Sequence, residues 1–314
     1  MPFSDNPIAA KPNNIQPYQK VTIIGNGQGE WQPAEIGHTF VFNATQHQAD
    51  NVINICNGPY AESSHAFAVS NSPDNSQLVA LLTQVADTLN RQLNCWPSSG
   101  LVTSFLMTIV ASQVSVQRMS LMPTLSRASS LAANEYLPCM VHNWLGERRL
   151  ALGLQLTNPH IYWPELFIDQ ASIPAELDTQ SEQPDINPFE VLLSDYIRRK
   201  NSDVKPTYYV GTSQALALQV TCERPAQPDL QYALLAALSN LPSVHWLSYA
   251  TQDDLITAEA LFYNEHPQTQ ASYWYLVDYQ ASQFLDNIRH HLAYCQQVLA
   301  LTAKSTTEND SKLS

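Results

Sequence analysis

The chain has 314 residues, of which 44% are hydrophobic and 14% charged, a composition typical of a globular protein rather than a disordered one. Its 15 Lys and Arg residues are outnumbered by 28 Asp and Glu residues, and the formal net charge is -13. Because nucleic-acid binding requires a basic face and no Lys/Arg cluster is large enough to form one, we expect no nucleic-acid partner. The first 151 residues carry 7 basic and 9 acidic residues, and the remainder 8 and 19, so an anionic ligand is favoured in the N-terminal half.

The N-terminal residues show neither the basic region nor the apolar region of a signal peptide, and no apolar run reaches about 18 residues. The five cysteines are scattered, odd in number and form no C-x-x-C pair. This pattern indicates reduced thiols rather than disulfides or a zinc site. We therefore expect a cytoplasmic protein with no transmembrane segment and no zinc site.

Residues 1–19 are rich in Pro, Asn and Gln and predict an irregular lead-in. The apolar run at 21–24 predicts a strand that ends in a glycine turn, and β-rich runs predict three more strands. These further strands are expected at 39–43, 52–56 and 65–70.

Two predicted helices and a strand follow. Apolar positions spaced three and four apart predict a helix from residue 76 to 89, and Pro97 opens a second helix that runs to 110. A strand is predicted at 114–122 and another helix at 150–156. This order favours right-handed crossovers and an α/β fold over residues 20–160: a Rossmann-like, mostly parallel sheet with helices on both faces.

The C-terminal half predicts a different architecture. Residues 161–190 are interpreted as an acidic, Pro-rich linker or loop, since 163–190 contains four prolines, seven acidic residues and no Lys or Arg. A smaller α+β region is expected over 191–303, followed by a disordered polar tail at 304–314. Its strands are predicted at 215–221, 244–249, 260–263 and 273–279, and its helices at 230–241 and 281–301.

A glycine turn follows the first predicted strand, with Gly25, Gly27 and Gly29 in alternation. A dinucleotide fingerprint would need Gly or Ala at position 30, where Glu30 stands, so NAD and FAD are not expected. The turn also resembles the loop of an S-adenosylmethionine-dependent methyltransferase, but Ile24 precedes it where that loop usually follows an acidic residue. An isolated match of this kind is also typical of a tight turn that binds nothing.

The motif Ser98-Ser99-Gly100 stands at the start of the second predicted helix. Free backbone N–H groups and two hydroxyls at a helix start favour binding of an anion. The motif lacks the lysine of a P-loop, so a triphosphate is not indicated. The alternative interpretation is an ordinary serine N-cap.

His142 precedes the predicted helix at 150–156, with Arg148 and Arg149 close by in the sequence. A histidine can act as a general acid or base near neutral pH, and an arginine could neutralise a leaving phosphate. A capping or packed histidine is the alternative.

The order of these motifs resembles the bacterial CMP-sialic acid sialyltransferases of glycosyltransferase family 42, over about residues 20–156. That family has a G-N-G turn after the first strand, a strand that ends in Asn, a Ser/Thr-Ser-Gly turn that begins a helix, and a catalytic histidine. The resemblance implies a CMP-sugar donor and a glycan acceptor, with no metal or other cofactor. It also implies inverting transfer, with His142 deprotonating the acceptor hydroxyl. The implied donor-binding residues are Asn26, Gly27, Asn43, Asn57, Ser98, Ser99 and Gly100.

The chain departs from the family pattern where two tyrosines should hydrogen-bond the leaving phosphate, because residues 121–127 contain no tyrosine. Tyr136 is the one candidate before His142, and we hypothesise that Arg127 or Arg148 stabilises the leaving charge instead. This departure favours a second hypothesis, a catalytically inactive sialyltransferase-like binding or scaffold protein. The methyltransferase is the third hypothesis. The sequence leaves the acceptor, the linkage and the oligomeric state open.

Overall fold

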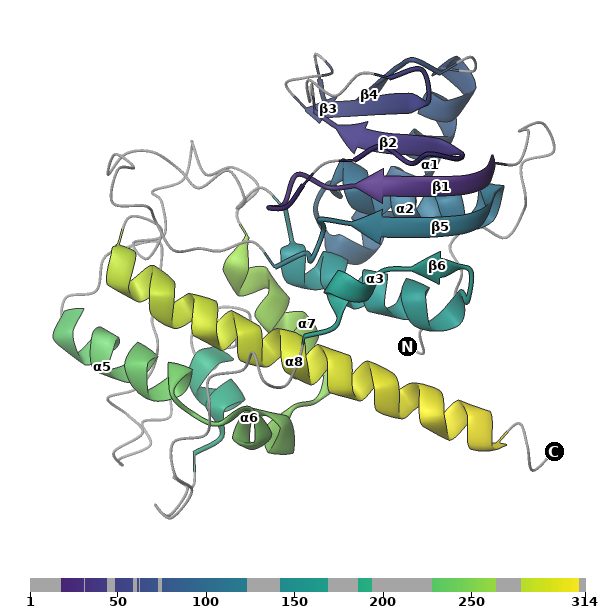
Figure 1. Ribbon diagram of the computed structural model, residues 1–314. Helices are drawn as coiled ribbons and strands as arrows, with labels where there is room; N and C mark the ends of the chain where they lie inside the picture. Colours follow the sequence, from purple (N-terminus) through teal and green to yellow (C-terminus); the bar gives the residue numbers. More distant parts are fainter. Residues whose placement is uncertain are drawn as a thin grey trace. The chain divides into compact units, whose positions relative to one another are not determined.

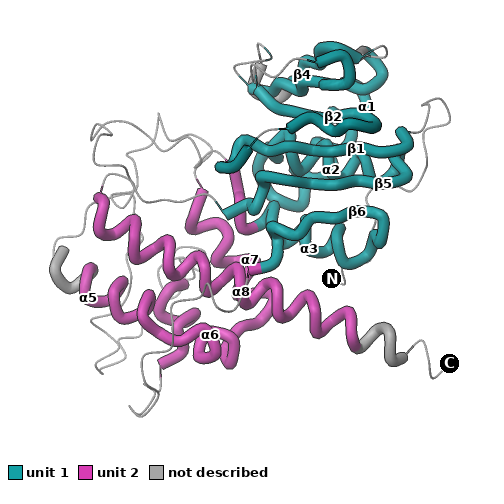
Figure 2. The backbone as a smooth tube through the Cα atoms, in the orientation of Figure 1, with its two compact units in different colours: residues 1–122, 146–167 teal, residues 123–145, 168–314 magenta. Residues whose placement is uncertain are grey.

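A computed structural model of the chain (Figure 1) divides it into two compact units (Figure 2). Unit 1 comprises Met1–Met122 and Gly146–Phe167, and unit 2 comprises Pro123–Leu145 and Ile168–Ser314. The residues that the structure describes are 18–30, 32–43, 49–58, 61, 63–72, 75–122, 142–168, 186–193, 228–263 and 278–310.

Unit 1 is built on a six-stranded sheet with the strand order β4-β3-β2-β1-β5-β6 (Figure 1). Neighbouring strands are parallel except β3 and β4, which are antiparallel. The predicted α/β fold with a mostly parallel sheet is thereby confirmed. The strands are β1 (Tyr18–Ile24), β2 (His38–Phe42), β3 (Val52–Gly58), β4 (Ser63–Ser70), β5 (Ala111–Gln117) and β6 (Ile161–Tyr162).

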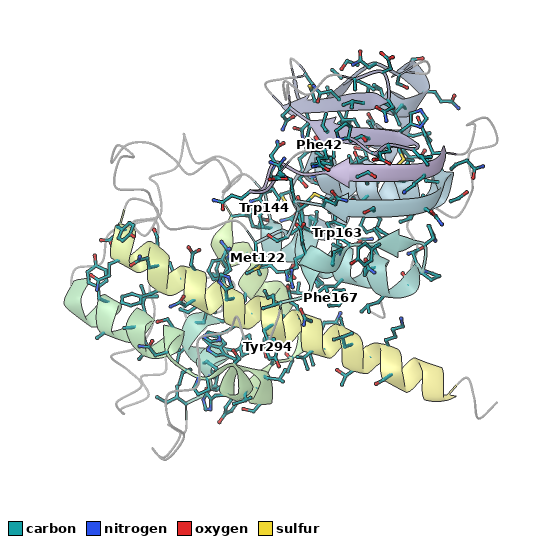
Figure 3. The ribbon with its side chains drawn as sticks, in the orientation of Figure 1. Phe42, Met122, Trp144, Trp163, Phe167 and Tyr294 are labelled. Carbon is teal, nitrogen blue, oxygen red and sulfur yellow. The ribbon has the colours of Figure 1, made fainter. Side chains whose placement is uncertain are left out.

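The central strands are apolar because they are covered on both faces. On one face Ile23 of β1 and its neighbour Phe40 of β2 are each 0% exposed, and on the other face Ile24 and Val41 are 2% and 1% exposed. Strands buried on both faces read as continuous hydrophobic runs rather than as alternating ones, which is why the sequence located them. Phe42, at the end of β2, and Trp163 also belong to this core (Figure 3).

Helices α1 (Asn75–Leu93) and α2 (Ser99–Val110) pack against each other on one face of the sheet (Figure 1). Helix α1 also contacts β4, and α2 contacts β5 and β1. Because α2 passes directly into β5, the start of α2 lies at the edge of the sheet where the carboxyl end of β5 lies. Helix α3 (Trp144–Thr157) then connects β5 to β6, and a short 3-10 helix, η3 (Pro164–Leu166), follows.

Three details of unit 1 differ from the sequence predictions. Strand β5 ends at Gln117 instead of at residue 122, because Arg118 adopts a left-handed backbone conformation with φ 54°. Helix α3 begins at Trp144, six residues earlier than expected. The predicted linker is wrong at its start, since Ile161 is buried and pairs with Val114 of β5. Residues 169–185 of that linker lie outside the described residues, as do residues 1–17 of the lead-in.

The regular elements that the structure describes in unit 2 are all helical. Helices α5, α6 and α7 contact the long helix α8, and residues 188–193 are also helical. The α+β architecture expected over 191–303 is therefore wrong for the described residues. The elements are α5 (Pro228–Ser239), α6 (Ser243–Tyr249), α7 (Gln252–Glu259), the 3-10 helix η6 (Ala260–Phe262) and α8 (Tyr279–Asp310).

The strands predicted at 244–249 and 260–263 are helical, and packing explains the first of them. In α6, Ser243 and Trp246 are buried while Val244 is 44% exposed, which is helical rather than strand spacing. The ring of Trp246 packs edge-on against Phe189, with the ring centroids 5.3 Å apart. In segment 260–263, Ala260–Phe262 forms a single 3-10 turn that follows α7, and Tyr263 has an extended backbone. The strand predicted at 215–221 lies outside the described residues, and Tyr279, the last residue of the strand predicted at 273–279, begins α8.

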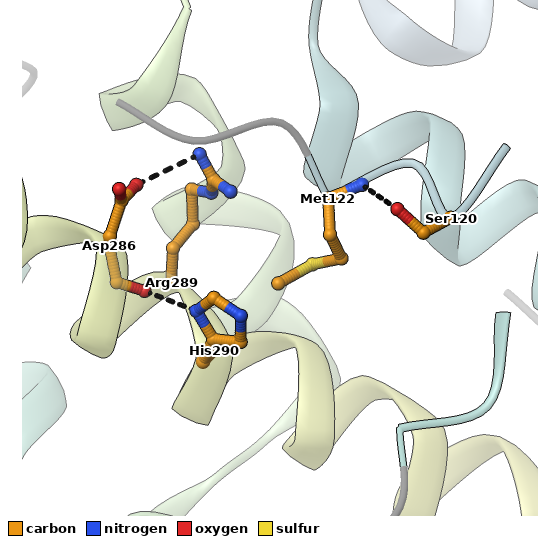
Figure 4. Close-up of polar contacts among 5 residues, drawn as sticks. All are labelled: Ser120, Met122, Asp286, Arg289 and His290. Atoms are coloured by element: carbon orange, nitrogen blue, oxygen red, sulfur yellow. Dashed lines mark hydrogen bonds and ion pairs between the residues drawn. The ribbon is translucent and has the colours of Figure 1, made fainter. Parts of the chain in front are cut away.

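Helix α8 carries a buried ion pair (Figure 4). Arg289 is 2% exposed, and its Nη1 lies 3.4 Å from Asp286 Oδ1. His290 Nδ1 donates to the Asp286 carbonyl at 2.7 Å. The helix continues to Asp310, so the tail expected to be disordered from residue 304 is helical for seven more residues, because extending an existing helix costs little. Among the described helices, none is long and apolar enough to cross a membrane.

Candidate functional site

The candidate site is the carboxyl edge of the sheet in unit 1, around β1. From β1 the chain adds β2 on one side and, later, β5 on the other, so the strand order reverses direction at this point. Ligands of open α/β sheets bind outside the carboxyl ends of the strands at such a switch point. The edge carries Asn26, Asn43 and Asn57 from β1, β2 and β3, and Arg118 from β5.

The glycine turn after β1 lies directly against the end of β5. The N–H of Gly25 donates to the Gln117 carbonyl at 2.9 Å, and the N–H of Gly27 donates to the Arg118 carbonyl at 3.1 Å. A Cβ atom on Gly25 or Gly27 would lie 2.5 or 2.6 Å from the Arg118 carbonyl oxygen. Both glycines are therefore required by backbone packing, whether or not a ligand binds.

Three asparagines connect the ends of neighbouring strands. Asn26 Nδ2 lies 3.5 Å from the carbonyl oxygen of Phe42, to which it donates. Asn43 has φ 58°, a conformation that Asn tolerates better than most residues, and its Oδ1 accepts the N–H of Asn57 at 3.1 Å. The sequence predicted each of these residues separately, and the structure brings them to one edge.

Ser98 caps the start of α2, and the carboxylate of Glu147, from α3, accepts hydrogen bonds from Ser98. Glu147 Oε1 accepts the N–H of Ser98 at 2.7 Å, and Oε2 accepts its hydroxyl at 2.5 Å. The same hydroxyl oxygen accepts the N–H of Leu101 at 3.3 Å. The hydroxyl of Ser98 is thus engaged within the protein.

Sequence reasoning did not identify Glu147. It is 0% exposed, and burial raises its pKa to about 7, although the hydrogen bonds from Ser98 favour the ionised form. A carboxyl group with this pKa can hold or release a proton near neutral pH. An acidic residue in the first turn of a helix is common, so its identity alone carried no signal that it would be buried.

Ser99 offers a different environment from Ser98. Its side chain is 4% exposed, and its hydroxyl has no hydrogen-bond partner among the described residues. The hydroxyl of Thr103, one turn further along α2, also has none there. Gly100 is packed under Met119, because a Cβ atom at position 100 would collide with the Met119 sulfur. Ser99 Oγ is thus an enclosed hydroxyl without a partner among the described residues, whereas the Ser98 hydroxyl is held by Glu147.

The arginine proposed as a leaving-group stabiliser at position 148 is buried in unit 1. Arg148 is 0% exposed, Nη1 donates to the Ser120 carbonyl at 3.1 Å, and Nη2 donates to the Leu166 carbonyl. Burial lowers its pKa to about 10, so it remains charged at neutral pH. Its bonds hold the segment after β5 to η3. Arg127 and Tyr136 lie outside the described residues.

His142 belongs to unit 2, two residues before α3 begins. Its side chain is half-buried, and its ring meets that of Trp144 edge-on with centroids 5.0 Å apart. The N–H of Trp144 donates to the His142 carbonyl at 3.0 Å.

Arg118 and Glu165 form the part of the edge that sequence reasoning missed. Glu165 Oε1 and Oε2 accept the N–H groups of Arg118 and Met119, each at 2.7 Å. The carbonyl of Met119 accepts the indole N–H of Trp163 at 2.6 Å, which further fixes the same turn. Because the strand was predicted to continue to residue 122, Arg118 was not recognised as the residue after its end.

Comparison with protein-family models, curated proteins and solved structures finds no match to this chain. In the described part of the chain, no group of three or more His, Cys, Asp or Glu residues is placed to hold a metal ion.

Proposed function

We propose that unit 1 binds a CMP-sugar at the carboxyl edge of its sheet, and that the protein is a sialyltransferase-like glycosyltransferase. It would transfer a sialic or related nonulosonic acid to a glycan acceptor with inversion, without a metal or other cofactor. The observation that carries this proposal is the convergence of Asn26, Asn43, Asn57 and Ser99 on one edge at the switch point. These residues are far apart in the sequence, and each matches a position of the family pattern.

The strand order supports a Rossmann-like fold. Leaving out the antiparallel edge strand β4, the parallel strands follow the order β3-β2-β1-β5-β6, which is that of a doubly wound nucleotide-binding sheet. In this proposal α1 and α2 cover one face and α3, the crossover between β5 and β6, covers the other.

The proposed roles follow the chemistry of each group. Asn26, Gly27 and Asn43 would contact the CMP portion, and Asn57 would line the donor sugar. Ser99 and the N–H groups at the start of α2 would hold the phosphate, because a helix N-terminus favours an anion. His142 would accept the proton of the acceptor hydroxyl. We place the activity in the cytoplasm, where the protein would be at most peripheral at the inner membrane.

A second candidate is an inactive sialyltransferase-like binding protein. One observation favours it: the hydroxyl of Ser98, one of the two in the motif, is held by Glu147 rather than presented to a ligand. This candidate predicts nucleotide binding without transfer.

Thermal unfolding with CMP, UDP, S-adenosylhomocysteine and NAD tests the binding step. We expect stabilisation by CMP alone, reduced in Ser99→Ala and Asn43→Ala. Absence of a shift with every nucleotide would refute both candidates, and a shift with S-adenosylhomocysteine alone would favour a methyltransferase.

Incubation with CMP-sialic acid tests the chemical step. We expect CMP release by the wild-type protein, loss of release in His142→Ala, and no loss in His38→Ala, which changes a half-buried histidine at the amino end of β2. Binding without release would favour the inactive protein. Full activity of His142→Ala would exclude that residue as the base.

A further inference from the structure

Arg118 occupies a fixed place at the switch point. It is the first residue after β5, and its backbone φ of 54° lies in the left-handed region, which is unfavourable for an arginine. The carboxylate of Glu165 holds this conformation by accepting the N–H groups of Arg118 and of the next residue. The chain therefore maintains a strained turn that directs one cationic side chain toward the turn after β1.

The guanidinium of Arg118 uses only one of its edges for this contact. Nε and Nη2 donate to the Gly27 carbonyl at 2.8 and 2.5 Å. Gly29, which has φ 131°, belongs to the same turn and lies beside the Arg118 side chain, because a Cβ atom on Gly29 would lie 3.4 Å from Arg118 Cγ. A guanidinium has five N–H donors, and the edge formed by Nη1 and the second hydrogen of Nη2 has no partner among the described residues. That edge has the fork geometry that matches two phosphate oxygens.

The charge of Arg118 is not neutralised by an acidic side chain that the structure describes. Both oxygens of Glu165 are directed at backbone N–H groups, and no ion pair to Arg118 is present among the described residues. The arginine side chain is half-buried, so a ligand can reach it from solvent. The predicted ligand groups Asn26, Asn43 and Asn57 are uncharged, so among the groups assigned to the nucleotide at this edge Arg118 is the one that carries a positive charge.

We propose that the Arg118 guanidinium binds the phosphate of the nucleotide at this edge, an inference that rests on the proposed function. In transfer, the acceptor oxygen bonds to the anomeric carbon and its proton passes to the base. The bond from the anomeric carbon to the phosphate oxygen breaks, and its electron pair stays on the phosphate, which gains one negative charge. Arg118 offsets that charge.

The test compares CMP with cytidine, which differ by the phosphate, in calorimetric titrations of the full chain. The variant Arg118→Gln removes the charge, while its amide can still donate to the Gly27 carbonyl. We expect it to bind CMP at least tenfold more weakly and cytidine as the wild type does. Arg118→Lys should keep part of the preference for CMP. The control Lys20→Gln, which removes an exposed positive charge from the amino half of β1, should change neither affinity.

The outcomes separate the two proposals. An unchanged ratio of CMP to cytidine affinity in Arg118→Gln overturns the role of Arg118 and leaves the proposed function standing. Equal loss of CMP and cytidine binding also overturns it, since the arginine would then act only on the structure of the turn. A wild-type protein that binds neither compound overturns the proposed function together with this inference.

Discussion

Glu147 and Ser98 form a buried pair in which one carboxylate accepts both the backbone N–H and the hydroxyl of the serine, at 2.7 and 2.5 Å. The pair joins α3 to Ser98, the N-cap residue of α2, although the two residues lie 49 positions apart in the sequence. It places a titratable group beside the start of α2, where the proposed phosphate would bind.

Glu147→Gln should change how stability depends on pH. Burial raises the folded-state pKa to about 7 from 4.5, so the folded protein binds this proton more tightly than the unfolded chain does. The contribution of Glu147 to stability is therefore complete below about pH 4.5 and is lost as the pH rises through about 7, by about 3 kcal/mol in total. Urea unfolding at pH 5 and pH 8 should show this loss in the wild type and not in Glu147→Gln. Identical pH dependence in both proteins would contradict the assignment.

His291 should contribute a pH dependence of the opposite sign. Its Nε2–H donates to the Ser239 carbonyl at 3.1 Å, and its Nδ1 accepts the Ser243 hydroxyl at 2.7 Å, so the neutral ring satisfies both partners. Burial lowers its pKa, and the charge of His290 acts in the same direction. The folded state binds the proton less tightly, so this stability is present above the unfolded pKa of 6.5 and is lost as the pH falls below it.

Urea unfolding at pH 7.5 and 5.5 measures the contribution of His291. The experiment uses the Glu147→Gln variant as its starting protein, because this variant lacks the opposite pH dependence that Glu147 contributes. We expect the further change His291→Gln to reduce the loss of stability on acidification. An unaltered loss would show that another group is responsible.

Gly100→Ala and Met119→Ala should not be additive. An added methyl group at position 100 collides with the Met119 sulfur, the flexible end of a side chain, and such overpacking costs about 1–3 kcal/mol. Met119→Ala alone removes buried volume and costs about 2–5 kcal/mol. In the double variant the new methyl group has room. The destabilisation of the double variant should therefore be smaller than the sum of the two single destabilisations by more than about 0.5 kcal/mol. Denaturant unfolding of the three variants measures this coupling, and additive costs would show that the two residues do not touch.

Glu165→Gln should weaken CMP binding while leaving cytidine binding in place. The amide keeps one acceptor oxygen, and its NH2 group faces an N–H donor that the carboxylate had accepted, so Arg118 is held less firmly. We expect a destabilisation of about 1 kcal/mol because the contact is exposed. Titration with both compounds is the measurement, with Glu190→Gln, an exposed site in unit 2, as the matched control. Unchanged CMP affinity would show that the hold of Glu165 on the Arg118 backbone does not affect CMP binding.

The sequence located the strands and helices of the N-terminal half because burial leaves a local signature there. Val21, Ile23 and Phe40 lie in strands covered on both faces, and a covered strand must be apolar throughout. Asn26 and Asn43 lie within two residues of the ends of β1 and β2, and Ser99 is the first residue of α2. The end of a strand or the start of a helix could therefore be identified for each before the fold was known.

The same local reasoning was wrong in the C-terminal half. Residues 244–249 are rich in residues that favour strands, yet they form α6 because Trp246 packs against Phe189 and stacks on His291. Helix α7 was missed although Thr251 caps it, with its hydroxyl accepting the N–H of Asp254 at 3.1 Å. Weak propensities there are overridden by contacts distant in the sequence.

The sequence by itself determined the glycine turn after β1 and the mostly parallel sheet that presents it, because both depend on short-range chemistry. Only the tertiary structure decided what lies against that turn. Arg118 reaches Gly27 across 91 positions of sequence, and Glu147 reaches Ser98 across 49. The identity of a polar residue in the sequence does not reveal whether its side chain faces solvent or contacts a distant backbone group. Its partner, its burial and its pKa are fixed only when the sheet brings the strand ends together.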